Sequence, residues 1–305
     1  MNYKQLTEKK KVAIDTLLEQ GYSMRKIGEL LKISHSTVSR YKSRRRHRRK
    51  LDINNKYPVF INYLYNHYDR RHHSVAVCVY LFKKKYKYAP SVSVQQVYNW
   101  IKDGKIHIAR EDICYKKRKN KKKNSGMMGH FLWNLENKTV LPISLRPKKL
   151  ELRDEIGHLE IDSIIGKKNE NKAIICIVDR CTRKVWLIKA EYTYDHYTSN
   201  LIYKYILEKG VSVKSITTDN GLEFNTMGIT AKRLGVKLYK CDPYCSFQRG
   251  SNERMNAIVR RWIPKGESLK LKPQRYLDDI CFEINSMPRK IFDFKTPFDI
   301  ELNKF

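Results

Sequence analysis

Three carboxylates in the second half of the sequence are spaced so that folding can bring them together. Asp162 lies in an alternating segment, Asp219 ends an apolar segment 57 residues later, and Glu253 lies in the amphipathic segment 251–263. Neighbouring carboxylates repel one another, and hard divalent cations with oxygen ligands relieve that repulsion. Two such ions, about 4 Å apart, hold the attacking and leaving oxygens of an in-line displacement at phosphorus. The three acids therefore indicate metal-dependent phosphoryl transfer.

The segments that carry these acids predict an α/β domain over residues 151–305. We predict strands over 158–165, 173–179, 184–191, 213–220 and 236–240, and helices over 195–208, 228–234 and 251–263. The first strand alternates, with Glu160 and Asp162 on one face, and the second is continuously apolar, as in a strand covered on both sides. This order is typical of a ribonuclease-H-like fold, in which the first and fourth strands are neighbours. Asp162 and Asp219 are thus expected side by side.

The charge of the chain points to a polyanionic partner. Lys and Arg number 63 against 31 Asp and Glu, a net charge of +32, and residues 1–150 hold 36 of the basic and 10 of the acidic side chains. Such an excess is typical of nucleic-acid-binding proteins. The longest apolar run, 75–82, is far shorter than the roughly 20 residues that span a bilayer. We therefore expect no membrane association and a cytoplasmic, nucleoid-associated protein of a prokaryote.

Residues 1–50 predict a helix-turn-helix domain. Helices are expected over 6–20, 24–31 and 35–44, begun by the capping residues Thr7, Ser23 and Ser34. Gly21 is expected to end the first helix in a left-handed conformation. The apolar side chains expected inside are Val12, Ile14, Leu17, Leu18, Ile27, Leu30, Leu31, Val38 and Tyr41.

The third of these helices is the predicted DNA reader. Short polar side chains open it, where base edges are contacted, and basic side chains follow for phosphates. The expected contacts are His35, Ser36, Thr37, Ser39, Arg40, Lys42, Arg44, Arg45 and Arg46. A helical bundle with no DNA role is the alternative. The dense basic tail 44–50 opposes it, because like charges repel unless counterions or phosphates neutralise them.

A second helical, helix-turn-helix-like DNA-binding domain is predicted over 51–110. Pro58 suits the first turn of one helix, the segment 74–87 is ambiguous between helix and strand, and Ser93 caps a helix over 94–102. The exposed readers on that last helix would be Gln95, Gln96 and Asn99. A helical linker domain with a polar surface remains the alternative.

Residues 111–150 predict a basic linker between the binding half and the α/β half. The run KKRKNKKK at 116–123 is followed by Asn, Ser and Gly, and Pro142 and Pro147 mark the approach to the next domain. A solvated charge run and a phosphate-binding segment are both compatible with this composition, since a linker that lies along DNA needs no fold of its own.

Several polar residues flank the three acids. Gln248 and Arg249 precede the Glu253 helix and are expected to meet phosphate, and Asn256 and Arg260 lie one and two turns beyond Glu253. Glu160 and Asp179 are nearby acids that we assign to structure, with a supporting role at the site left open. His158 shares a face with Asp162, and we assign it a packing role or a supporting role behind the site.

Four ordered segments resemble a known family. They are RPKKLELRDEIGHLEID (146–162), VDRCTRK (178–184), TTDNGLEF (217–224) and PYCSFQRGSNERMNAIVRRWIPKG (243–266). With them, the chain resembles DDE transposases of the insertion-sequence-thirty family, whose catalytic core is related to retroviral integrases. The resemblance runs from the N-terminal helices to about residue 270.

The resemblance implies a fold, a site and a reaction. The fold is α + α/β, with helix-turn-helix domains before a ribonuclease-H-like catalytic domain of the retroviral integrase superfamily, here 151–305 with a C-terminal helical extension. Asp162, Asp219 and Glu253 correspond to the catalytic, metal-binding triad. The implied reaction is cleavage and strand transfer of the element's terminal inverted repeats into target DNA, with two Mg²⁺ ions, or Mn²⁺, per site and a dimer or higher oligomer.

Two other functions are compatible with the same residues. The first is a DNA-binding regulator whose catalytic half is inactive and repurposed. The second is a nuclease of the same fold that acts on structured nucleic acid without a terminal repeat. Nicking of end-containing DNA with a divalent ion separates the transposase from the regulator, and a strand-transfer product separates it from the nuclease.

Overall fold

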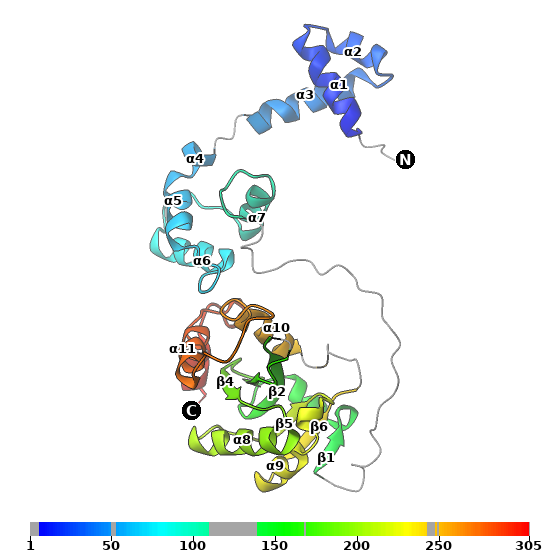
Figure 1. The fold of residues 1–305 in the computed structure, drawn as a ribbon. Coiled ribbons are helices and arrows are strands. Elements are labelled where there is room, and N and C mark those ends of the chain that lie inside the picture. Colours follow the sequence, from blue (N-terminus) through cyan, green and yellow to red (C-terminus); the bar gives the residue numbers. More distant parts are fainter. Residues whose placement is uncertain are drawn as a thin grey trace. The chain divides into compact units, whose positions relative to one another are not determined.

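The structure is a computed structural model that describes residues 6–49, 53–109, 139–167, 169–242, 248 and 250–304 (Figure 1). The chain divides into two compact units. The first contains residues 1–65 and 88–91, and the second contains 66–87 and 92–305. No helix among the described residues is long and apolar enough to cross a membrane.

The first unit begins with the predicted helix-turn-helix. Its helices are α1 (Glu8–Glu19), α2 (Met24–Leu30) and α3 (His35–Arg49). The predicted caps are confirmed, because the Thr7, Ser23 and Ser34 side chains accept the backbone N–H groups of Lys10, Lys26 and Thr37 at 3.4, 3.2 and 3.2 Å. Gly21 ends α1 with a φ of +86°.

A small apolar core holds these three helices together. Ile14, Ile27 and Val38 are fully buried, one from each helix. The prediction that Val12 and Leu30 face inward is wrong, since they are 63% and 52% exposed. Three short helices enclose a single small core. Apolar side chains at the edge of the apolar face of a helix therefore remain exposed to solvent.

Gly28 lets the turn between α2 and α3 close tightly. A Cβ atom at this position would lie 2.9 Å from the carbonyl oxygen of Ile33, which is backbone and cannot move away cheaply. The N–H of Ile33 donates to the carbonyl of Gly28 at 2.9 Å. The glycine therefore sets the approach of α3 to α2.

Four further helices precede the sheet: α4 (Ile53–Lys56), α5 (Pro58–His67), α6 (Val75–Lys85) and α7 (Val94–Lys102). The segment 74–87, ambiguous in sequence, is helical. Ser74 caps α6 by accepting the N–H of Val77, and three lysines end it, where cations favour the helix dipole. Ser93 caps α7, as predicted, by accepting the N–H of Gln96.

The rest of the second unit is built on a six-stranded sheet. Its strands are β1 (Val140–Pro142), β2 (His158–Ile165), β3 (Ala173–Asp179), β4 (Val185–Ala190), β5 (Ser215–Thr218) and β6 (Lys237–Lys240). They lie in the order β1-β6-β5-β2-β3-β4, with β2, β3 and β4 antiparallel and β2, β5, β6 and β1 parallel. Without β1, the strands lie in the order β6-β5-β2-β3-β4. This is the strand order of the ribonuclease-H-like fold, as predicted.

Helices and short 3₁₀ turns complete this unit. The helices are α8 (Asp195–Glu208), α9 (Met227–Arg233), α10 (Gly250–Val259), α11 (Gln274–Asn285) and α12 (Pro297–Leu302), and the turns are η3 (Ile143–Leu145), η4 (Lys148–Glu151), η5 (Leu222–Phe224) and η7 (Lys290–Phe292). Residues from α8 and α9 form one apolar cluster with Leu159 and Ile161, and residues from α10 and α11 form a second with Ile164 and Cys176 (Figure 1). Helices thus cover both faces, and the side of β2 that carries Ile164 faces α10.

Candidate active site

Asp162 and Asp219 lie on neighbouring parallel strands. The pairing of β2 with β5 sets Glu160 opposite Thr217. Two residues further along each chain, the same register leads to Asp162 and to Asp219, which follows the last residue of β5. Both aspartates are half-buried. Asp162, in the middle of β2, therefore lies level with the carboxyl end of the neighbouring strand β5, where Asp219 follows.

Glu253 is held over this end of the sheet by α10. Met255, Ile258 and Val259 bury one side of the helix in the core. On another side Asn256, three residues after Glu253, donates from Nδ2 to Asp162 Oδ2 at 2.7 Å. Residues three apart on a helix are neighbours. The helix face that carries Glu253, itself half-buried, is thus fixed to β2 at Asp162.

The donor chemistry of this cluster suits a hard cation. Carboxylate oxygens are the ligands that Mg²⁺ prefers, and Asp162, Asp219 and Glu253 supply three carboxylates. Asp162 Oδ1 accepts the N–H of Ser163 and Asp219 Oδ1 that of Gly221, each at 3.0 Å, which orients both groups. In the described part of the chain, no three His, Cys, Asp or Glu side chains already form a metal-binding group. The metal site stays a prediction.

Glu223, in η5, is an acid near this site that sequence reasoning missed. Its Oε1 accepts the hydroxyl of Ser163, the residue after Asp162. A Cβ atom at Gly221 would lie 2.6 Å from Glu223 Oε2 and 3.0 Å from Asp219 Oδ1. The two carboxylates therefore flank Gly221 together. In the sequence, the signal for Glu223 was its position four residues after Asp219, in the turn DNGLEF (219–224).

A buried lysine fixes the loop that follows Asp219. Lys240, at the end of β6, is 4% exposed, and its Nζ donates to the carbonyls of Asp219 and Phe224 at 3.1 and 2.9 Å. Asn220 Nδ2 donates to the carbonyl of Cys241 at 2.7 Å. The end of β6 thus holds the turn predicted after Asp219.

We expect Lys240→Met to loosen this turn. The variant removes two hydrogen bonds from a charged donor to buried carbonyls, so the free energy of unfolding should fall by about 2–4 kcal/mol. Urea unfolding followed by circular dichroism measures the loss. Lys237→Met on the exposed start of the same strand should change stability by less than about 1 kcal/mol. Equal effects of the two substitutions would contradict the role given to Lys240.

The other residues predicted beside the acids make protein contacts in this structure. Gln248 exchanges two hydrogen bonds with Asp242, at 2.7 and 2.9 Å. Arg260 donates to the carbonyl of Ile165 at 2.8 Å, and burial lowers its pKa. Arg249 lies outside the described residues. Arg260 therefore ties α10 to the end of β2, and phosphate contact by Gln248 and Arg260 stays a prediction.

The two acids assigned to structure, and the histidine, are placed as that assignment expects. Asp179 is buried and accepts the N–H groups of Gly157, Cys181 and Thr182 at 2.7–3.0 Å, which closes the turn after β3. His158 is hydrogen bonded to Ser215 and Glu155 at 2.8 and 2.9 Å. Glu160 is buried and ion-paired with Arg180.

The predicted DNA readers lie on α3 and α7. His35, Ser36, Arg40 and Lys42 are exposed, and Thr37 and Ser39 are half-buried. The Ser34 hydroxyl is hydrogen bonded to those of Ser36 and Thr37, at 3.0 and 2.7 Å, so both hydroxyls also serve the cap. Arg44, Arg45 and Arg46 belong to α3, and their side chains lie outside what the structure describes.

On α7 the predicted readers form a local polar pair. Gln95 and Asn99 are exposed and Gln96 is half-buried. Gln95 Nε2 donates to Asn99 Oδ1 at 3.2 Å, one helical turn away. DNA contact by these three side chains stays a prediction.

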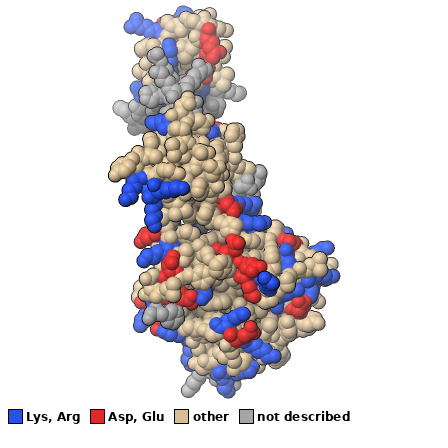
Figure 2. All heavy atoms as spheres, turned by 90° about the vertical axis from the view of Figure 1, so that its left-hand side faces the viewer, with Lys and Arg blue, Asp and Glu red and all other residues tan. Residues whose placement is uncertain are grey.

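A basic cavity of about 490 Å³ adjoins the side of α10 that carries Ser251, Met255 and Ile258. Its cationic lining residues are Arg153, Arg183, Arg254, Arg261, Arg289 and Lys290, and among the residues that the structure describes no Asp or Glu lines it. On the face drawn in the lower part of Figure 2, basic and acidic side chains are interspersed. The cavity is therefore a local concentration of positive charge that favours polyanions.

Comparisons with known proteins agree with this architecture. A helix-turn-helix domain family matches residues 2–41. The transposase of insertion sequence element IS4351 from Bacteroides fragilis is 33% identical over 213 residues, which cover 68% of this chain and 62% of that protein. The transposase of IS30A from Escherichia coli K12 is 34% identical over 169 residues, covering 55% of this chain and 43% of that protein.

The chain is similar to transposases of several insertion sequences, IS4351 and IS30A among them. It spans less than two thirds of the length of these two transposases. Among solved structures, the catalytic core domain of BIV integrase matches with a TM-score of 0.36 at 18% identity, over 48% of this chain and 94% of that one. The N-terminal helix-turn-helix and the strand order predicted from the sequence are both present in this chain.

Proposed function

We propose that the protein is a DDE transposase, which binds the terminal inverted repeats of its insertion sequence, cleaves them and joins them to target DNA. The observation that carries the proposal is that the elements bearing the three acids, β2, the end of β5 and α10, are held against one another. The β2–β5 register leads to Asp162 and Asp219 side by side, and Asn256 on the Glu253 helix is hydrogen bonded to Asp162. The similarity to transposases supports the same reaction.

In this proposal Asp162, Asp219 and Glu253 hold two Mg²⁺ ions, for which Mn²⁺ can substitute. When bound, such ions lower the pKa of an attacking water or hydroxyl and neutralise charge that develops at phosphorus. The chain's own residues orient the acids. Asn256 and the N–H of Ser163 fix the carboxylate of Asp162, and Gly221 fixes that of Asp219.

The remaining parts of the chain would bring DNA to this site. We propose that residues 1–50 and the helical segment 51–110, which the two compact units share, bind DNA. The basic linker predicted over 111–150 ends earlier than predicted, because β1 (Val140–Pro142) pairs with β6 of the sheet. We propose that this sheet and its helices, predicted over 151–305, are the catalytic core. Both element ends must be held at once for coordinated transfer, so the active species is a dimer or larger. Target and terminal DNA are both double-stranded.

Incubation of the purified protein with labelled DNA tests the function. The probe is a duplex carrying the sequence that flanks this gene in its genome, with Mg²⁺ or with EDTA. We expect nicking that frees a 3′-hydroxyl, and a strand-transfer product with added plasmid, only with the ion. Binding without any nicking would instead identify a repurposed regulator, and nicking without dependence on the flank would identify a nuclease.

Substituting Arg40 should relax sequence preference. An exposed arginine on the outer face of α3 is placed to contact a base edge, and loss of such a contact costs about 1–3 kcal/mol of discrimination. For Arg40→Ala we expect the affinity for flank DNA to fall toward that for random DNA, measured by fluorescence anisotropy. Lys42→Ala should weaken binding to both DNAs alike, as a phosphate contact does. Uniform weakening by Arg40→Ala would reassign Arg40 to phosphate.

A further inference from the structure

A buried ion pair lies under the start of α10. Glu160, on β2, is fully buried, and its Oε1 lies 3.0 Å from Nε of Arg180, which is 1% exposed. The free-energy cost of removing two charges from water can exceed the attraction between them. A buried ion pair is therefore weak evidence that the pair stabilises the fold. Glu160 also lies two residues before Asp162, on the same face of the strand.

The second oxygen of Glu160 anchors α10. Oε2 accepts the backbone N–H of Asn252, at 3.3 Å, in the first turn of the helix, where N–H groups have no partner within the helix. In the amide orientation that satisfies both groups, the Asn252 side chain donates to the carbonyl of Glu160 and accepts the N–H of Ile161, each at 3.2 Å. Asn252 is fully buried and directly precedes Glu253. The pair thus fixes the residue before the third acid.

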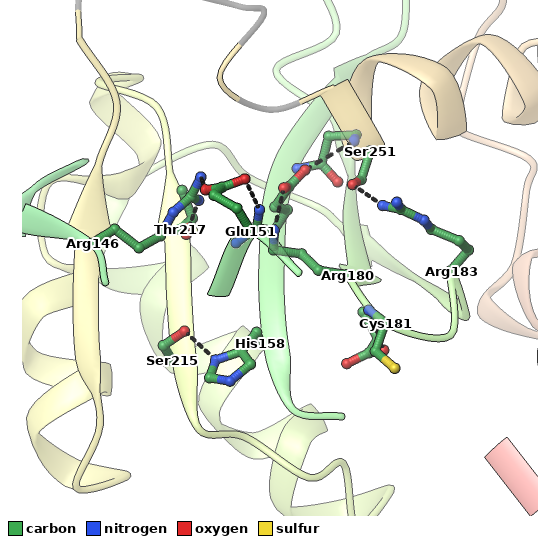
Figure 3. Close-up of polar contacts among 12 residues, drawn as sticks. Arg146, Glu151, His158, Arg180, Cys181, Arg183, Ser215, Thr217 and Ser251 are labelled. Atoms are coloured by element: carbon green, nitrogen blue, oxygen red, sulfur yellow. Dashed lines mark hydrogen bonds and ion pairs between the residues drawn. The ribbon is translucent and has the colours of Figure 1, made fainter. Parts of the chain in front are cut away.

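The same pair is connected to β5. Nη2 of Arg180 lies 2.8 Å from Oε2 of Glu151, and Oε1 of Glu151 lies 2.5 Å from Nη2 of Arg146. The other terminal nitrogen of Arg146 donates to the Thr217 hydroxyl at 3.3 Å, as Figure 3 shows. Thr217 lies on β5 two residues before Asp219. We call Arg146, Glu151, Arg180 and Glu160 the charge relay.

The charge relay contacts the chain next to each acid. Its contacts lie two residues before Asp162, two before Asp219 and one before Glu253. Two cations alternate with two anions along it. Each guanidinium reaches two partners, which a lysine ammonium cannot do with the same fixed geometry. A shift of one member is therefore passed to the backbone beside all three carboxylates.

We propose that the charge relay is a positioning device that sets the spacing of Asp162, Asp219 and Glu253 for divalent ions. This inference rests on the proposed function, because it requires that the three acids bind metal. Arg180 is its central positioning residue, since it alone contacts both carboxylates of the relay. The relay touches neither DNA nor ion in this role.

Direct metal binding tests the proposal in the full-length protein. Mn²⁺ affinity is measured by calorimetry without DNA, beside the thermal midpoint and the affinity for flank DNA. Glu151→Gln keeps an acceptor but loses the charge, and Glu151 is 52% exposed, so the variant should fold. Arg180→Lys keeps the charge but loses the two-sided contact. We expect both to weaken Mn²⁺ binding tenfold or more, as loss of groups that orient metal ligands does, with DNA affinity unchanged.

A matched control separates positioning from stability. Lys184→Met breaks the ion pair of Lys184 with Glu301, at 2.6 Å, whose side chains are 19% and 23% exposed. This pair ties the start of β4 to α12 and contacts none of the three acids. We expect Lys184→Met to lower the thermal midpoint and leave Mn²⁺ affinity at the wild-type value.

The outcomes are distinct. Suppose that the wild-type protein binds Mn²⁺ and cleaves DNA. If Glu151→Gln and Arg180→Lys then bind Mn²⁺ as tightly as the wild type does, the charge relay is overturned and the proposed function stands. Equal weakening by Lys184→Met also overturns it, because general stability would then explain the loss. A wild-type protein that neither binds Mn²⁺ nor cleaves DNA overturns the proposed function and the relay with it.

Discussion

Replacing Asp219 by Asn should abolish cleavage of end-containing DNA and leave end binding intact. The substitution keeps the size of the side chain and an oxygen to accept the N–H of Gly221, which lies 3.0 Å from Oδ1. It removes the negative charge that attracts the cation. Loss of several kcal/mol of transition-state stabilisation corresponds to a rate decrease of about 10³-fold or more. The nicking rate with Mg²⁺ and a gel-shift assay of flank DNA measure the two effects.

The same result is expected for Asp162→Asn and Glu253→Gln, because one site needs all three acids. Asp195→Asn makes the same chemical change in the first turn of α8, where the carboxylate accepts the N–H of His196, and should leave cleavage unaffected. Loss of DNA binding together with cleavage in the triad variants would mean that the acids are structural, and the phosphoryl-transfer proposal would fail.

Ile14→Asp should remove the preference of the protein for its own end sequence. Ile14 is fully buried between the three helices of the helix-turn-helix, and an aspartate there is a buried charge without a partner. We expect these helices to unfold. Specific binding is about 10³-fold or more tighter than non-specific binding, so affinity for flank DNA should fall by that order toward the value for random DNA. Anisotropy titrations on both DNAs measure the change.

Val12→Asp provides a matched control on the same helix. Val12 is also β-branched and apolar, but it is 63% exposed, so an aspartate there stays in water. Sequence preference should be retained. If Ile14→Asp also keeps the preference while proteolysis shows residues 1–50 unfolded, the reader lies elsewhere, and α7 with Gln95, Gln96 and Asn99 becomes the candidate.

Local patterns were sufficient to predict strands β2 to β6 and the segments that carry Asp162 and Asp219. The continuous apolar run of β3 is buried throughout, and the alternation of β2 separates Leu159 and Ile161 from the face of Asp162. The strand order then followed from the order of the elements. Caps such as Ser23 and Ser93 act within three residues, which is why they could be identified from sequence.

Features that depend on distant partners could not be predicted. β1 has three residues in a segment expected to be a linker, and it becomes a strand only by pairing with β6, about 100 residues away. Arg180 appears in sequence as a turn residue, and its burial depends on Glu160 and Glu151. The segment of α6 was ambiguous because its β-branched valines at 75, 77 and 79 are typical of a strand. In the structure the segment is a helix that Ser74 caps.

The position of β1 and η4 in the chain has a mechanical consequence. The polypeptide enters the α/β sheet through β1, which pairs with β6, and then supplies Arg146 and Glu151 before β2 begins. Force applied to residue 139 from the N-terminal half therefore acts first on the edge of the sheet and then on these two side chains.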